Sequence, residues 1–126
     1  MLLASVAFLA AAAAAQAPSM SVTEVLAKSE ALEKKGLLAY FSSDLRQIKA
    51  EAKSDVDAFG AELLTAWKAH RPLPACPPQD SNGWKFTFNT DEVLQYYRSI
   101  PVQRRAMSSR EAFAEFMSKK FPCPRR

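Results

Sequence analysis

The sequence has little of the residues on which many small enzymes and metal sites depend. It contains three glycines, Gly36, Gly60 and Gly83, so it holds no glycine-rich phosphate loop and no dinucleotide-binding motif. One histidine, His70, and two cysteines are too few for a zinc finger or a zinc ribbon. The composition therefore excludes these nucleotide enzymes and predicts neither a cofactor nor a metal ion.

Charge is absent from the beginning of the chain, where no charged residue precedes Glu24. Residues 2–15 are apolar except for one serine, and this run is shorter than the roughly 20 residues that a membrane helix needs. Small residues suited to cleavage by signal peptidase precede Gln16. We expect residues 1–15 to be a signal peptide for export to the periplasm and residues 16–126 to be one domain without an integral membrane segment. An alanine-rich helix buried in the fold is the alternative.

Export would place the two cysteines, Cys76 and Cys123, in an oxidising compartment, where a lone pair is most simply a structural disulfide. A redox pair or a metal site is disfavoured, because the chain has no C-x-x-C motif and no histidine beside either cysteine. The chain-entropy model assigns such a bridge about 4 kcal/mol. We expect it to supply much of the stability of the domain.

The net charge of +4 comes from the second half of the chain. Residues 1–70 carry 7 basic and 8 acidic side chains, whereas residues 71–126 carry 10 and 5. A basic surface can attract an acidic protein partner, and export argues against nucleic acid. A charged surface that only keeps the protein soluble is the alternative. The candidate partner-binding basic face consists of Arg104, Arg105, Arg110, Lys119 and Lys120.

Capping residues and apolar spacing predict four helices. Residues 72–83 contain four prolines and the turn pair Asn82-Gly83, which predict an irregular loop, and a short extended stretch can follow at residues 84–88. The predicted fold class is all-α, a compact bundle of about four helices with one disulfide. The helices are expected to begin at Ser21, at Ser42 or Ser43, at Asn89 and at Ser108, and to end near Gly36, Arg71, Pro101 and Pro122.

The third and fourth helices are joined by a short connection, so antiparallel packing is expected. That packing brings the beginning of the third helix close to the end of the fourth. Cys76 and Cys123 lie near these two points in the sequence. The helix pattern and the cysteine pair therefore predict the same arrangement.

The sequence shows no catalytic constellation, and we expect no enzyme. His70 is more simply a cation at a helix end than a catalytic base. Asp55 and Asp57, or Asp91 and Glu92, are too close along a helix to face each other, so surface positions are expected for them. Aromatic side chains at helical or alternating spacing are expected in the core, with a ligand site as the alternative; these are Trp84, Phe86, Phe88, Tyr96 and Tyr97.

Residues 72–123 resemble the Rap/Tai family of small exported immunity proteins. That family shows, in this order, a Cys-x-Pro loop, a helix with paired apolar and tyrosine positions, a Pro-x-x-Arg linker and a terminal aromatic-Pro-Cys. The corresponding segments of this chain are Cys76-Pro77-Pro78, 90–97, Pro101 with Arg104 and Arg105, 112–117 and Phe121-Pro122-Cys123.

The resemblance implies an all-helical periplasmic protein with a disulfide between Cys76 and Cys123. It also implies that the protein binds and inhibits a peptidoglycan amidase effector delivered by type VI secretion, and does so by occlusion, without catalytic residues of its own. Whether the protein forms a homodimer is left open. A small periplasmic stress or chaperone-like binding protein is the alternative function.

Overall fold

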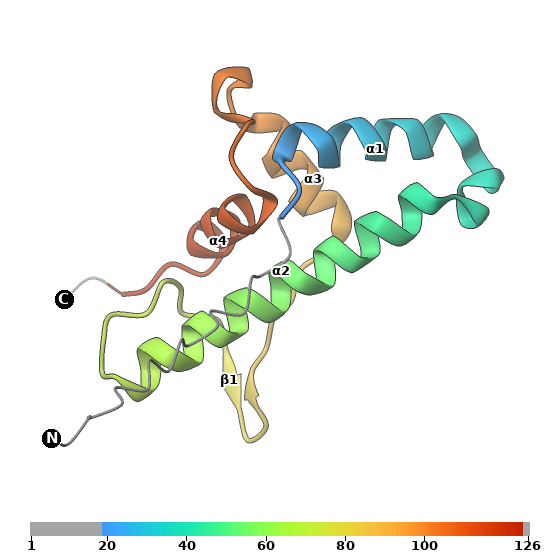
Figure 1. Cartoon of the computed structure of the whole chain (residues 1–126). Coiled ribbons are helices and arrows are strands. Elements are labelled where there is room, and N and C mark those ends of the chain that lie inside the picture. The colour runs from blue at the N-terminus through green and yellow to red at the C-terminus, as the bar shows by residue number, and fades with distance from the viewer. Residues whose placement is uncertain (1–18, 125–126) are drawn as a thin grey trace, which may run out of the picture.

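Four α-helices and one disulfide make up the fold of residues 19–124, the part of the chain that the computed structural model describes (Figure 1). The predicted all-α class is thus confirmed, whereas the predicted signal peptide, residues 1–15, lies outside the described residues. Within residues 19–124, no helix combines the length and the apolar character needed to cross a bilayer. The elements are α1 (Val22–Lys35), η1 (Gly36–Phe41), α2 (Ser43–Lys68), β1 (Gln79–Asp80), β2 (Gly83–Trp84), α3 (Thr90–Ser99), η2 (Val102–Arg104) and α4 (Ser109–Lys120).

Each α-helix begins where the sequence predicts a cap. The Ser42 side chain accepts a hydrogen bond from the Leu45 amide, which settles the choice between two adjacent serines. Asn89 and Glu92 each accept a hydrogen bond from the other's backbone amide, at 2.9 and 3.0 Å. Such caps satisfy amides that have no partner within the helix and contribute about 1 kcal/mol each. The other two caps are Ser21 and Ser108.

Helices α1 and α2 form an antiparallel hairpin whose tip projects away from α4 (Figure 1). The turn is the 3-10 helix η1, which begins at Gly36, where the backbone has a φ of 56° that favours glycine. Asp44 joins the two helices by ion pairs with Lys28 at 3.2 Å and Lys35 at 3.6 Å. The connection between α1 and α2 is therefore a helical turn, and the two ion pairs join the helices next to it.

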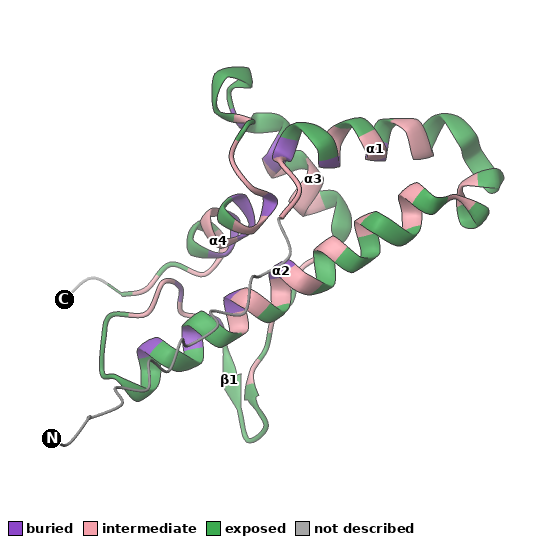
Figure 2. Ribbon diagram, viewed as in Figure 1, coloured by how far each residue is buried: buried purple, intermediate pink, exposed green. Residues whose placement is uncertain are grey.

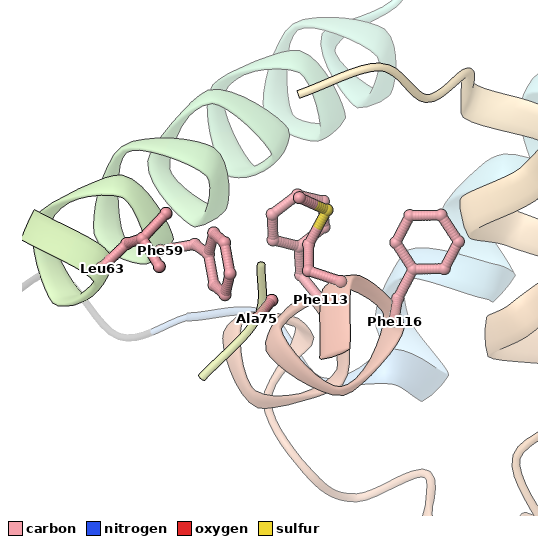
Figure 3. Close-up of a cluster of buried hydrophobic side chains, with 6 residues drawn as sticks. Phe59, Leu63, Ala75, Phe113 and Phe116 are labelled. Carbon is pink, nitrogen blue, oxygen red and sulfur yellow. The ribbon is translucent and has the colours of Figure 1, made fainter. Parts of the chain in front are cut away.

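The larger hydrophobic cluster lies between α2 and α4, and Figure 3 shows its rings directed toward one another. Phe59 of α2 meets Phe113 of α4 edge to face, with ring centroids 6.0 Å apart. Such ring pairs contribute about 0.5–1.5 kcal/mol beyond the burial of their area. The buried members are Phe59, Leu63, Ala75, Phe113, Phe116 and Met117.

A second cluster joins α1, α3 and α4. Its buried members include Val22, Val25, Tyr97 and Ala112. The segment before α1 runs beside the segment before α4, because the Val22 amide donates to the Met107 carbonyl at 3.0 Å. Figure 2 shows buried positions on α4, at the start of α1 and along the second half of α2, while the hairpin tip is exposed.

The disulfide joins Cys76 to Cys123, as predicted, with the Cα atoms 4.9 Å apart. The Cys76 amide also donates to the Phe121 carbonyl at 2.8 Å, which attaches the proline-rich loop to the end of α4. Lys120 and Glu92 form an ion pair at 2.7 Å, so the end of α4 does lie beside the start of α3. Both parts of the predicted arrangement are confirmed.

Candidate functional site

The least expected polar residue is Asp55, whose side chain is only 4% exposed. The sequence predicts a surface position for it, and that prediction is wrong. Asp55 precedes Phe59 by four residues and therefore shares the face of α2 that packs against α4. Its neighbour Asp57 is exposed and pairs with Lys53 at 2.7 Å, as expected for a surface carboxylate.

Ser109, at the start of α4, connects Asp55 to a second carboxyl group, that of Glu51. The Ser109 Oγ lies 2.7 Å from Asp55 Oδ2 and 2.6 Å from Glu51 Oε1. A hydroxyl carries one proton, so it can donate to only one of these oxygens at a time. Both contacts are hydrogen bonds only when one carboxyl is protonated, so this arrangement can hold one shared proton.

The two carboxyl groups have opposite pKa shifts. Burial, together with the nearby charge of Glu51, raises the pKa of Asp55 to about 6 despite the hydrogen bond from Ser109. Burial also acts to raise the pKa of Glu51, but hydrogen bonds from Ser109, Ser19 and the Met20 amide outweigh it and lower that pKa. Asp55 is thus the group that takes up the shared proton.

The segment before α1 completes this network. Ser19 Oγ donates to Glu51 Oε1 at 2.5 Å, and the Met20 amide donates to the same oxygen at 2.9 Å. The Met20 carbonyl in turn accepts from the Ser109 amide at 2.7 Å. Glu51 therefore binds the first described residues to α2 and α4.

A cavity of about 90 Å³ adjoins the network, where all four α-helices meet. One end is polar, and the rest of the wall is mostly apolar. Tyr97, at the polar end, donates its hydroxyl to the Ser109 carbonyl at 3.1 Å, and burial raises its pKa. Ser109 itself is 1% exposed, so a large substrate cannot reach its hydroxyl. The apolar wall includes Val25, Ile48, Val56, Phe88, Val93, Leu94 and Phe113.

Each residue of the candidate basic face makes a contact within the fold. Lys119 and Lys120 lie at the end of α4, and Arg104 lies in η2, where it pairs with Glu115 of α4 at 2.9 Å. Lys119 stands over the Tyr96 ring, 5.1 Å from its centroid, and Lys120 pairs with Glu92. Acidic or aromatic partners therefore engage all three cations.

The other two arginines of the candidate face make different contacts. Arg105 donates to the carbonyls of Ile100 and Arg98, each at 2.9 Å, and so caps the end of α3. Arg110 reaches α2, where it donates to Ser54 at 3.3 Å. All five cations therefore make contacts within the fold, and their role as a partner-binding face stays a prediction.

An exposed apolar surface at the hairpin tip was not singled out by the sequence reasoning. Its four side chains in η1 are 72–83% exposed, although large apolar side chains are usually at least partly covered. We call this surface the apolar tip; its members are Leu37, Leu38, Tyr40 and Phe41. The signal was present in the sequence as four large apolar residues within five positions of a helix connection.

The remaining candidate residues have structural surroundings. His70 is exposed, just beyond α2, and has a positive φ of 54°. Trp84, Phe86, Phe88 and Tyr96 are partly buried against the hydrophobic clusters, and Tyr97 is buried within one, as expected for core aromatics. Among residues 19–124, no group of three potential ligands is placed to hold a metal ion.

Comparison with known proteins gives no further assignment. The chain matches no protein-family model, no curated protein and no solved structure. The resemblance to the Rap/Tai family therefore stays a prediction from the sequence.

Proposed function

We propose that the protein is a periplasmic immunity-type protein that binds a peptidoglycan amidase effector and inhibits it by occlusion. The observation that carries the proposal is the apolar tip, because a projecting group of exposed apolar side chains is typical of a protein interaction site. The amidase is supplied by the resemblance of residues 72–123 to the Rap/Tai family.

The way in which α1 and α2 hold the apolar tip suits an inhibitor that inserts this tip into the cleft of an enzyme. It follows α1 without a break, and Asp44 holds the two helices together just behind it. A projection that keeps its conformation on binding loses little conformational entropy, so more of the interaction energy contributes to affinity. Lys34 and Arg46 are exposed near the tip and can speed association with an acidic enzyme.

The test is capture of partners from native envelope extract with the tagged mature protein, followed by an inhibition assay. We expect one stoichiometric peptidoglycan hydrolase whose activity falls when it is bound. Phe41→Ser should weaken this binding at least about tenfold, as expected for an interface anchor. Val102→Ser is the matched control, because Val102 is 71% exposed but lies in η2. Equal binding by both variants would exclude the tip as the contact surface.

The alternative, a stress or chaperone-like binding protein, is favoured by one observation. An acid-responsive protein needs a carboxyl group that titrates above the usual range, and burial raises the pKa of Asp55 to about 6. This function predicts that many envelope proteins are captured in substoichiometric amounts, mainly at low pH. Capture of a single hydrolase at neutral pH would exclude it.

A further inference from the structure

A surface groove lies where α2 ends, and the proposed inhibition does not use it. The 26 residues of α2 make a helix about 39 Å long, which separates this groove from the apolar tip. Two adjoining hollows of about 440 and 670 Å³ form the groove, and His70, Arg71 and Leu73 line both of them. The first hollow also includes Trp67, whereas the second extends over the disulfide and Pro124. We call the two hollows together the basic groove.

The backbone at His70 has a conformation that glycine adopts at lower cost. Its φ is 54°, and His70 is the one residue other than glycine with a positive φ among residues 19–124. The His70 amide donates to the Trp67 carbonyl, and the next amide donates to the Ala66 carbonyl, so the chain closes the end of α2 here. Glycine is the usual residue at such a helix end. A strained residue in this place indicates a role for its side chain, because strained residues concentrate at functional sites.

The cations of the basic groove have no partner within the described part of the chain. The side chains of His70 and Arg71 make neither a hydrogen bond nor an ion pair with residues 19–124, and the same is true of Lys68, which is exposed one turn earlier. The five cations of the candidate basic face, by contrast, all contact other groups. No acidic side chain of the described residues lines the groove. The groove therefore attracts an anion.

Trp67 gives the same groove an apolar wall. Its side chain is 54% exposed, although it is the largest type of apolar side chain. Trp84 meets its ring edge to face, with the centroids 5.8 Å apart, and so supports the ring from one side. Tryptophan and arginine are the residue types that most often anchor binding. Their presence in one groove suits a ligand that carries a carboxylate close to an apolar group.

We propose that the basic groove binds the C-terminal end of an extended peptide whose last side chain is large and apolar. The terminal carboxylate accepts hydrogen bonds from the guanidinium of Arg71, which matches its two oxygens, and from the ring N–H of His70. The last side chain lies against Trp67 in the first hollow, and the preceding residues lie over the disulfide in the second. A small acid would fill only one of the two hollows, which is why the groove favours a peptide.

The test uses the oxidised mature protein and the peptide N-acetyl-alanyl-alanyl-phenylalanine. Nitrogen-15 NMR at pH 7.5 follows the indole and backbone amide signals during titration. We expect saturable shifts at the Trp67 indole and at the amides of His70 and Arg71. The same peptide with a C-terminal amide keeps the shape but loses the charge, and a peptide ending in glycine loses the apolar side chain. Each should bind at least about tenfold more weakly.

Three variants separate this site from general attraction to a basic protein. Arg71→Gln should weaken binding of the phenylalanine peptide about tenfold or more. Arg46→Gln is the matched control and should leave binding unchanged, because Arg46 is also exposed on α2 and also has no partner among the described residues. His70→Gly should unfold at a higher urea concentration, since the strain is relieved, and yet bind the peptide more weakly.

Two results would overturn the proposal. One is equal binding of the acid and the amide peptides by the unaltered protein, and the other is equal binding by Arg71→Gln and the unaltered protein. Shifts spread over lysines and arginines of the whole surface would give both results and would show only nonspecific ion pairing. The apolar tip takes no part in this experiment, so the peptide site and the proposed inhibition can fail separately.

Discussion

At the scale of single residues, Asp55 is where α2 departs from simple amphipathic patterning. A buried carboxylate is normally paired with a cation at hydrogen-bond distance, because burial strongly disfavours the ionised form. The nearest partners of Asp55 are instead the Ser109 hydroxyl and, beyond it, the Glu51 carboxyl. The network therefore suits a protonated Asp55, which can donate to Ser109 while Ser109 donates to Glu51.

This proton makes the stability of the fold depend on pH near neutrality. The pKa of Asp55 is about 6 in the folded protein, above the ordinary value of 3.8, so folding is favoured by protonation. Its stabilising contribution is complete below pH 3.8 and is lost as the pH rises through 6. Between pH 7.5 and pH 5 the unaltered protein should gain about 1 kcal/mol in unfolding free energy from this group.

Urea unfolding of the unaltered protein and of Asp55→Asn at pH 5 and pH 7.5 measures this gain. Asp55→Asn should lack it, so the stability difference between the two proteins changes by about 1 kcal/mol across this range. Asp57→Asn is the control and should follow the unaltered protein. A pH-independent difference between the unaltered protein and Asp55→Asn would show that Asp55 is ionised throughout.

At the scale of the elements, the local signals of helix ends predicted most of the fold. The four caps depend on side chains that bond to the amide three residues later, so the sequence alone is enough to place them. The pairing of Cys76 with Cys123 was equally accessible, since the chain has only these two cysteines. Interactions between residues close in sequence, and a pairing that has no alternative partner in the chain, can therefore be predicted from the sequence.

The features that were missed depend on contacts between distant residues. Asp55 is buried because Ser109, 54 positions away, packs over it, and no local pattern specifies that contact. The contacts of the basic side chains are equally nonlocal, since Arg110 donates to Ser54 of α2 and Arg104 pairs with Glu115 of α4. The composition gives the number of charged side chains, but it does not predict which residues they contact.

The disulfide should contribute more stability than any other single link between elements. It closes a loop of 47 residues and holds the proline-rich segment, which has little regular structure of its own, against α4. Replacing both cysteines, as Cys76→Ser with Cys123→Ser, should lower the unfolding free energy by about 4 kcal/mol. Urea unfolding of this variant, and of the unaltered protein with and without reductant, measures the effect.

Reductant should destabilise the unaltered protein and leave the doubly substituted one unchanged. If the reduced and oxidised forms unfolded at the same urea concentration, the loop would be held by its noncovalent contacts alone. The hydrogen bond from the Cys76 amide to Phe121 is one such contact and remains available in the variant.

At the scale of the whole molecule, the structure separates a packed body from the projecting tip of the α1–α2 hairpin. The two hydrophobic clusters lie where α4 meets α2 and where it meets α1 and α3 (Figure 2). The far end of the hairpin contributes no member to either cluster, and its largest side chains face solvent. Exposed apolar side chains that the fold does not need are most simply explained by binding of a partner protein, which is the basis of the proposed function.

This separation predicts that the apolar tip can be changed without loss of the fold. Leu38→Ser should alter the unfolding free energy by no more than about 0.5 kcal/mol, because a side chain 72% exposed loses few contacts. Leu63→Ala, on the same hairpin but fully buried between α2 and α4, should cost about 2–5 kcal/mol. Urea unfolding compares the two, and capture of the partner measures binding by the same proteins. A loss above about 1 kcal/mol in Leu38→Ser would mean that the tip supports the fold. Retained stability with lost binding is the combination that an interaction surface requires.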